Sequence, residues 1–269
     1  RLVLKEQELA GVDIPSDGEM RRTEMTEYFT SRIGGFVFKG PVRVWGNNYF
    51  NKAAVVDRVA YLGPMLVDEF RFARASTEKR LKVPITGPYT IADWSFNEYY
   101  RDKLELADDL AGIINREMRE LAAVAGVPAK LAVHICYGDY RSLFPRVLDA
   151  KVDQFALEFT NRRFRDLDLL KEYGYQKELG LGVIDVHNPR VETVEEVKEG
   201  IRKALEVLPP EKIYVNPDCG LKLLSKETAL EKLKVMVRGA REMERELETG
   251  SRNRRLSSGT WNTGRIHGI

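Results

Sequence analysis

The sequence predicts an α/β fold, specifically a (β/α)8 barrel, from three observations. Short apolar runs alternate with long amphipathic, charged segments along the 269 residues. Buried parallel strands read as continuous apolar runs, and their alternation with helices indicates βαβ units. Candidate catalytic and metal-binding residues follow the ends of these runs, and the active sites of barrel enzymes lie at the corresponding ends of the strands. A doubly wound sheet would normally carry a glycine-rich phosphate-binding turn after an early strand. The chain has no such turn, so a barrel is expected.

The predicted elements follow this alternation in chain order. Each expected strand is a short apolar run, and each expected helix is a longer segment in which apolar and charged residues alternate at helical spacing. Six strands are expected, at Gly11–Pro15, Lys82–Thr86, Lys130–Cys136, Asp153–Glu158, Gly180–His187 and Lys212–Asn216. The main helices are expected at Asp102–Ala125, Arg162–Leu179, Val194–Leu208 and Lys226–Leu247.

Six strands are two fewer than a barrel needs. One absent strand would precede Arg1, and the other would lie at Pro128–Ala129, just before the strand Leu131–Cys136. We expect that segments are omitted from the sequence at these two points. The alternative is a genuine deletion, which would leave an open barrel with exposed sheet edges. A normal Cα separation of about 3.8 Å between Pro128 and Ala129 would contradict the omission.

The composition excludes several classes of function. The formal net charge is +2 and the basic residues are spread along the chain, so no nucleic-acid-binding surface is expected. The chain contains no run of about 18 apolar residues, which predicts no membrane span. It opens with no secretory signal and has two cysteines, so a cytoplasmic protein is expected. Residues 1–249 are expected to form the barrel, and residues 250–269 a flexible tail or a segment left from cloning.

His134 and Cys136 lie two positions apart on one apolar run, so both side chains point to the same side of a strand and can bind one ion. Glu158 and Cys219 follow the ends of later runs. Two thiolates, one imidazole and one carboxylate form a ligand set that suits zinc. Their origin on separate strands, with one exchangeable carboxylate, indicates a site that admits a substrate. Zinc would deprotonate a bound thiol and make it a nucleophile at neutral pH.

These residues also have a structural interpretation. A single cysteine is more often a small buried residue, and a single histidine is more often a hydrogen-bonded core residue; the combination favours the metal site. His187 follows a further apolar run and can be a fifth ligand, a structural residue or a general acid. Because four ligands already complete the coordination of zinc, the role of general acid is preferred for His187. Asp185 either orients the His187 side chain or is a buried strand residue.

Five motifs occur in order along the chain. They are Asp17-Gly-Glu-Met-Arg-Arg-Thr-Glu-Met-Thr-Glu-Tyr-Phe29, Thr86-Gly-Pro-Tyr-Thr-Ile-Ala-Asp-Trp-Ser95, His134-Ile-Cys-Tyr-Gly-Asp139 followed by Glu158, Asp185-Val-His-Asn-Pro-Arg190, and Val215-Asn-Pro-Asp-Cys-Gly-Leu-Lys222. Together they closely resemble the catalytic domain of the cobalamin-independent methionine synthase family. The resemblance covers roughly Leu4 to Leu247. It implies a zinc-dependent barrel enzyme that transfers a methyl group to homocysteine.

The resemblance assigns roles to individual residues of this chain. It implies that zinc is bound by four residues, His134, Cys136, Glu158 and Cys219. Glu158 would also face the substrate, because the sulfur of homocysteine would displace Glu158 from zinc or loosen its bond to zinc. Glu19 would hold the amino group of homocysteine, and Trp94 would flank a folate methyl donor. His187 would be the acid associated with methyl transfer.

The chain departs from the family in two respects. Full-length plant and bacterial members have a second, N-terminal barrel-like half, whereas this chain resembles the short, core-only versions found mainly in archaea. For these, a methylated corrinoid protein is an alternative donor to methyltetrahydrofolate, and both donors remain open. The family motifs Gly-Ser-Phe-Pro, in the opening strand, and Ile-Asp-Glu-Pro, just before the His-x-Cys strand, are absent. They belong to the two strands that the strand count lacks.

Two other functions remain open. A related zinc-thiol alkyltransferase would use another thiol such as coenzyme M. A sulfonate thiol would require basic residues, whereas Glu19 suits the ammonium group of an amino acid, so homocysteine is favoured. A catalytically idle zinc-binding barrel, or a partner of a corrinoid protein, is the third possibility. The presence of both His187 and Glu19 argues against an idle barrel.

Overall fold

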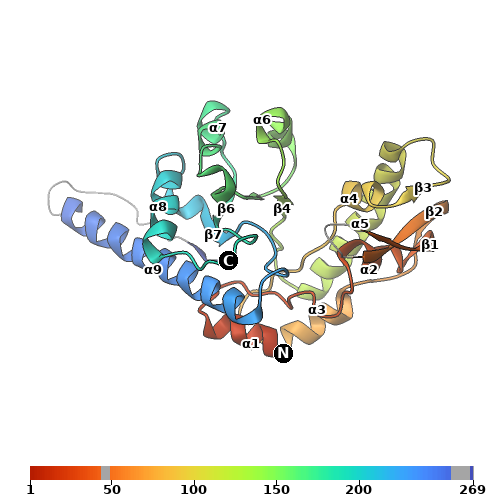
Figure 1. Cartoon of the computed structure of the whole chain (residues 1–269), viewed down its shortest axis with the longest axis horizontal. Coiled ribbons are helices and arrows are strands. Elements are labelled where there is room, and N and C mark those ends of the chain that lie inside the picture. Colours follow the sequence, from red (N-terminus) through yellow and green to blue (C-terminus); the bar gives the residue numbers. More distant parts are fainter. Residues whose placement is uncertain (44–48, 256–266, 269) are drawn as a thin grey trace. The chain divides into compact units, whose positions relative to one another are not determined.

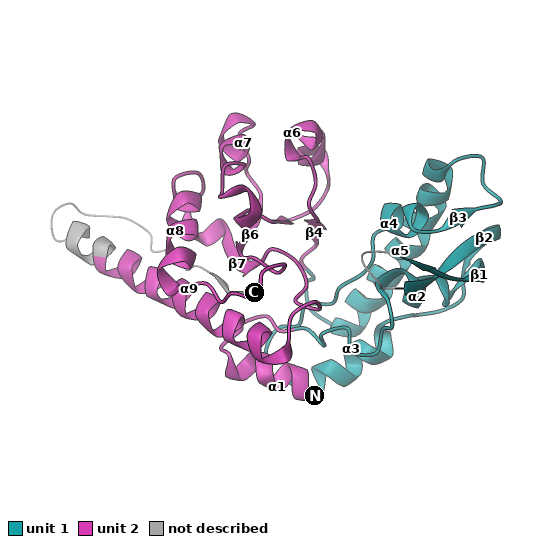
Figure 2. Cartoon of the chain, in the orientation of Figure 1, with its two compact units in different colours: residues 1, 16–129 teal, residues 2–15, 130–269 magenta. Residues whose placement is uncertain are grey.

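The computed structural model of the chain describes residues 1–43, 49–255, 267 and 268 (Figure 1). These residues form two compact units, and each unit is described by itself (Figure 2). Unit 1 consists of Arg1 and Ser16–Ala129, and unit 2 consists of Leu2–Pro15 and Lys130–Ile269. No helix among the described residues is long and apolar enough to cross a membrane.

Unit 1 is built on an antiparallel hairpin and one long helix. Its elements are α2 (Met25–Thr30), β1 (Ile33–Arg43), β2 (Tyr49–Tyr61), α3 (Val67–Arg74), α4 (Pro88–Asp93), β3 (Phe96–Asn97) and α5 (Lys103–Ala125). β1 and β2 form the hairpin, and β3 pairs in parallel with β2. The hairpin is not among the predicted elements. The predicted helix Asp102–Ala125 is confirmed as α5, which packs Leu106 and Leu110 into the core of this unit.

The sequence explains both ends of α5. The Asp102 carboxylate accepts hydrogen bonds from the N–H groups of Leu104 and Glu105, which would otherwise lack a partner within the helix. At the other end, Gly126 has a φ of +64°, a conformation that costs glycine little. The helix therefore ends just before Pro128–Ala129, where the sequence predicts a missing strand.

Two of the six predicted strands are wrong as strands. Gly11–Pro15 and Lys82–Thr86 contain no strand residues, and the only β contact in this region of the described chain is one isolated parallel bridge between Ser16 and Lys82. Both runs contain a proline, Pro15 or Pro84, which has no N–H group to donate to a ladder. The bridge nevertheless has the parallel direction that a barrel requires.

Unit 2 contains the parallel sheet. Its elements are α1 (Leu2–Leu9), β4 (Ala132–Ile135), α6 (Tyr140–Leu143), β5 (Gln154–Leu157), α7 (Leu167–Glu172), β6 (Glu178–Ile184), α8 (Val194–Leu205), β7 (Ile213–Pro217), α9 (Lys226–Arg255) and β8 (His267–Gly268), with short 3-10 turns at Arg146–Asp149, Thr160–Arg162 and Pro210–Lys212. The strands are all parallel, in the order β4-β5-β6-β7-β8. α8 and α9 pack against each other and against β6 and β7 (Figure 1). Four predicted strands are confirmed as β4 to β7.

The predicted helix Arg162–Leu179 is wrong in its length. The structure has a 3-10 turn at Thr160–Arg162 and then the short helix α7. Two residues between them, Arg163 and Phe164, have positive φ values, and Gly174 has a φ of +62° just beyond the helix. An α-helix cannot continue through a left-handed residue. The remaining residues of the prediction lead into β6, which begins at Glu178.

The α/β class with a parallel sheet is confirmed, and the described strands do not close into a barrel. β4 is at one edge of the five-stranded sheet and β8 at the other. α9 extends to Arg255, beyond the predicted domain boundary at residue 249, and β8 pairs with β7. The rest of the predicted tail, residues 256–266 and 269, lies outside the described residues. The boundary at residue 249 therefore stays a prediction.

Candidate metal centre

Three of the four predicted ligands meet at the carboxyl ends of parallel strands in unit 2. His134 is in β4, Cys136 follows β4 and Cys219 follows β7. One nitrogen and two sulfur atoms from these residues all lie within 4.8 Å of one another, and the two sulfurs are 3.4 Å apart. His134 and Cys136 are both exposed, while Val133 and Ile135 are half-buried, which confirms the shared face predicted from their spacing.

The imidazole of His134 is oriented by the neighbouring strand. Its Nδ1 lies 2.9 Å from the carbonyl oxygen of Ala156, the cross-strand partner of His134 in β5. Because a carbonyl can only accept, Nδ1 carries the proton and Nε2 keeps its lone pair. This is the arrangement in which a metal-binding histidine is held by a second partner. Burial opposes protonation of the ring, but the hydrogen bonds with Cys219 and Ala156 outweigh it and raise the pKa of His134.

The two thiols are hydrogen bonded to each other. Their hydrogen bond lowers the pKa of Cys219 and raises the pKa of Cys136, with His134 adding to the effect on Cys219. The hydrogen bond therefore favours ionisation of one thiol of the pair and opposes ionisation of both. A metal cation bound by both residues would take the place of the thiol protons and allow both thiols to ionise.

The fourth predicted ligand, Glu158, is not part of this group of three, but it interacts electrostatically with His134 and Cys136. It follows β5 and is fully buried. Its Oε2 is hydrogen bonded to the hydroxyl of Tyr140, whereas its Oε1 is buried and has no hydrogen-bond partner in the described part of the chain. Burial raises the pKa of Glu158. Two thiols, an imidazole and an unpaired carboxylate oxygen are together a donor set that fits zinc.

Asp218 connects the segment of Cys219 to the segment of Glu158. Its buried carboxylate accepts hydrogen bonds from the Phe159 N–H at 3.1 Å and from the side chain of Thr160. Burial raises the pKa of Asp218 to about 6. This packing depends on Gly182 of β6, because a Cβ there would lie 2.3 Å from Asp218 Oδ1 and 2.8 Å from the Leu157 carbonyl oxygen. The glycine therefore allows two ligand-bearing segments to approach each other.

His187 lies on the segment after β6 and is exposed. Its backbone N–H donates to the Asp185 carboxylate at 2.9 Å, so Asp185 orients the backbone of this segment rather than the imidazole ring. The ring of Tyr137 packs against the His187 ring with 4.9 Å between centroids. The Tyr137 hydroxyl is buried and has no hydrogen-bond partner among the residues that the structure describes. Tyr137 directly follows the predicted ligand Cys136, so the His187 ring packs beside the segment that carries this residue.

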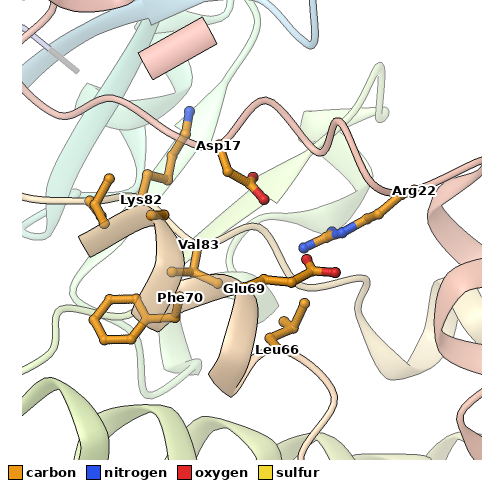
Figure 3. A pocket seen from close by; sticks show the side chains of 9 residues that line it. Asp17, Arg22, Leu66, Glu69, Phe70, Lys82 and Val83 are labelled. Carbon is orange, nitrogen blue, oxygen red and sulfur yellow. The ribbon is translucent and has the colours of Figure 1, made fainter. Parts of the chain in front are cut away.

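The other two predicted substrate-binding residues belong to unit 1. Glu19 has a φ of +55°, and its carboxylate lies 3.1 Å from the guanidinium of Arg22. The Glu19 side chain is 37% exposed and that of Arg22 is 3% exposed. Arg22 also lines a small pocket with Asp17 and Glu69 (Figure 3). Glu19 is therefore accessible, and its orientation is set by a buried partner.

Trp94 has a packing role within unit 1. It follows α4, is half-buried, and lies with its ring centroid 5.4 Å from that of the buried Phe50 at an angle of 48°. This contact supports the interpretation of Trp94 as a packing residue, which is the commoner one. The assignment of Trp94 to a folate donor stays a prediction.

Four residues near these positions are not among the predicted site residues. Tyr137 and Tyr140 contact His187 and Glu158, Arg22 contacts Glu19, and Lys232 holds the segment of His187. Three of them lie inside the sequence motifs or directly beside them, so the motifs pointed to their positions. Lys232 has no such signal, because it lies in the middle of an ordinary charged helix.

Comparison with known proteins places these features in a family. A model of the family described as "Cobalamin-independent synthase, Catalytic domain" matches residues 1–128 and 122–242. A methionine synthase of Thermococcus kodakarensis is 52% identical over 276 residues, covering 91% of this chain and 82% of that protein. A methionine synthase of Saccharolobus solfataricus is 50% identical over 279 residues, covering 91% and 83%.

Solved structures agree with these matches. A B12-independent methionine synthase from Shewanella sp. W3-18-1, in complex with selenomethionine, superimposes with a TM-score of 0.85 and 28% identity, over 93% of this chain and 87% of that one. A putative vitamin-B12 independent methionine synthase from Listeria monocytogenes has a TM-score of 0.70 at 19% identity, over 90% and 85%, which supports the fold alone.

The alignments also bear on the predicted missing segment. The match to the Thermococcus kodakarensis protein spans 276 positions, whereas 91% of 269 residues is about 245, so about 31 positions have no residue of this chain opposite them. The family match likewise falls into two parts, which meet at residues 122–128. Pro128–Ala129 lies at this junction and at the boundary between the two units. The junction of the two parts of the family match thus coincides with the predicted point of omission, and the omission itself stays a prediction.

Proposed function

Since this chain belongs to the cobalamin-independent methionine synthase family, we propose that it transfers a methyl group to the thiol of homocysteine and so forms methionine. The observation that carries this proposal is the convergence of His134, Cys136 and Cys219, with the unpaired Glu158 oxygen next to them. Soft ligands with one replaceable carboxylate are suited to a catalytic zinc ion that must accept a thiol.

The chain's own residues would hold the metal and place the substrate. His134, Cys136, Glu158 and Cys219 would bind zinc. When bound, zinc would lower the pKa of the homocysteine thiol and supply a thiolate at neutral pH. Glu158, the only carboxylate of the set, would give up its position as the substrate sulfur arrives.

Recognition of the substrate's amino group is assigned to a residue of unit 1. The partly exposed carboxylate of Glu19 would accept the ammonium group of homocysteine. Holding two reactants in line is worth a large effective concentration. Glu19 also favours an amino-acid thiol over a sulfonate thiol such as coenzyme M, because a carboxylate repels a sulfonate.

The donor is either methyltetrahydrofolate or a methylated corrinoid. With the folate, the bond between nitrogen and the methyl carbon breaks as the bond between sulfur and carbon forms, and the leaving nitrogen takes a proton from His187. With the corrinoid, the leaving group needs no proton, so His187 would only shape the pocket. Trp94, which is half-buried and packs on Phe50, is proposed to flank the folate.

Replacement of one ligand tests the proposal. We expect Cys219→Ser to lose bound zinc and homocysteine methylation together, measured by metal analysis and by methionine formation with methyltetrahydrofolate and methylcobalamin in parallel assays. Ser225→Ala, in the loop that leads into α9, is the control and should keep both. A Cys219→Ser protein that retained zinc and activity would refute the site.

A further inference from the structure

The hydroxyl of Tyr140 is at the centre of a buried cluster of hydrogen bonds in unit 2. It donates to Oε2 of Glu158 and accepts from the Glu158 backbone N–H at 3.1 Å. The carbonyl oxygen of Ile135, one residue before Cys136, lies 3.2 Å from the same hydroxyl. Tyr140 is 1% exposed and Glu158 is fully buried. One side chain thus links the end of β4 to the end of β5.

The hydroxyl is not needed to fill space. The Tyr140 ring already packs against Phe159 at 6.4 Å and lies under the guanidinium of Arg162 at 5.6 Å. A phenylalanine would make the same ring contacts without bringing a polar group into the core, where a polar group is costly unless it is hydrogen bonded. The hydroxyl is therefore best explained by its partners, and two of its three contacts are to Glu158.

The contact of the Tyr140 hydroxyl with Oε2 makes the two carboxylate oxygens of Glu158 unequal. Oε2 is held by the tyrosine hydroxyl, while Oε1 has no partner within the described residues. The backbone of the same residue is held by the same hydroxyl, so the side chain has little freedom to turn. Only Oε1 is left available to a cation.

We propose that Tyr140 is the positioning residue for the exchangeable zinc ligand. This inference rests on the proposed function, since it requires zinc at the cluster. Tyr140 leaves one oxygen of Glu158 free to bind the metal, and its hydroxyl would stay hydrogen bonded to the carboxylate if homocysteine replaced Glu158 as a ligand. A displaced carboxylate that stayed buried without a partner would be costly. A neutral hydroxyl that remains bonded to it lowers this cost, so the exchange of ligands becomes easier.

The first measurement is zinc affinity in the absence of substrate, determined by competition with a chromophoric chelator. We expect Tyr140→Phe to bind zinc about 10-fold more weakly, since partners that orient a metal ligand are worth roughly 10–100-fold in affinity. The matched control is Tyr175→Phe. Tyr175 is also a buried tyrosine of unit 2, but its hydroxyl bonds the carbonyl oxygen of Glu178 at 2.6 Å. Its replacement should leave zinc affinity unchanged.

The second measurement separates a role through Glu158 from a general role in the fold. Tyr140→Phe is repeated in a Glu158→Ala background, where there is no carboxylate to position. If Tyr140 acts through Glu158, the double variant binds zinc as Glu158→Ala does. An equal loss of zinc affinity in both backgrounds would show that Tyr140 only stabilises the packing of the strands, and it would overturn the inference.

The third measurement is the affinity of the zinc-loaded proteins for homocysteine, followed by calorimetry. We expect weaker binding to Tyr140→Phe than to wild type, since the released carboxylate loses its partner. Wild-type zinc and homocysteine affinities in Tyr140→Phe would refute this inference while leaving the proposed function intact. A wild-type protein that bound no zinc, or a Cys219→Ser variant that kept it, would instead refute the proposed function, and this inference with it.

Discussion

The Nζ atom of Lys232 lies 2.9 Å from Oε2 and 3.0 Å from Oε1 of Glu192, and both side chains are buried in unit 2. The same ammonium group donates to the carbonyl oxygens of Asp185 and Arg190. Glu192 in turn accepts from the Asp185 N–H at 3.0 Å. Residue 232 of α9 therefore fixes both ends of the segment that carries His187.

The first prediction concerns this ion pair. Lys232→Met should lower the free energy of unfolding by about 3–5 kcal/mol, because it leaves a buried carboxylate without its charged partner. Chemical denaturation followed by circular dichroism measures the loss. Lys234→Met is the control, since its ion pair with Glu231 is more than half exposed and should be worth less than about 1 kcal/mol. Equal losses of unfolding free energy in the two variants would contradict the stabilising role of the buried Lys232–Glu192 ion pair.

The second prediction concerns Arg22, which fixes the carboxylate proposed to bind the substrate ammonium. Arg22→Gln should raise the KM for homocysteine about tenfold, because a hydrogen bond between charged groups is worth roughly 1.5–3 kcal/mol. Zinc content should not change, since the ligands are all in unit 2. Arg21→Gln is the matched control, because Arg21 is exposed and stacks on Phe72. A loss of zinc, or an unchanged KM, would count against the assignment.

The third prediction uses His187 to identify the methyl donor. With methyltetrahydrofolate, His187→Asn should lower kcat by roughly 100-fold or more, the usual range for a lost general acid. With methylcobalamin, whose leaving group needs no proton, kcat should stay near the wild-type value. Parallel steady-state assays with the two donors give the comparison, and zinc analysis shows that the metal is retained. Equal losses with both donors would rule out the acid role.

The fourth prediction concerns pH and the start of α8. Hydrogen bonds from the Arg190 guanidinium and the Thr193 N–H lower the pKa of Glu196 to about 2, from 4.5 in an unfolded chain. A carboxyl whose pKa is lower in the folded state stabilises the fold above its unfolded pKa, and the effect is lost as the pH falls through the folded pKa. Because Glu196 is 48% exposed, we expect no more than about 1 kcal/mol.

Glu196→Gln tests this effect, since glutamine keeps the shape of the cap and removes the charge. The variant should be less stable than wild type at pH 7 and equal to it near pH 2, measured by urea denaturation at both values. Glu199→Gln, three residues further along α8, is the control for removing a carboxylate away from the helix cap. A difference between Glu196→Gln and wild type that persisted at pH 2 would show that the charge is not responsible.

The sequence by itself determined the α/β class and most of the candidate site. Continuous apolar runs can only be buried parallel strands or helices, and their short length identified β4 to β7. The two-residue period of a strand placed His134 and Cys136 on one side. Parallel strands all end at the same edge of a sheet, so Cys219 could be assigned to the same site from its place in the chain.

Only the tertiary structure decided which side chains hold these residues in place. Tyr140 and Glu158 are 18 positions apart, and Lys232 and Glu192 are 40 apart, and no local pattern relates them. The structure also decided that α7 is shorter than the predicted helix and that Gly11–Pro15 and Lys82–Thr86 are not strands. Both outcomes depend on backbone conformation and on the hydrogen-bond partners that are available. Periodicity reports which face of an element is buried, because burial repeats along the chain. A hydrogen bond between distant side chains depends on how the elements pack, so no periodic pattern in the sequence predicts it.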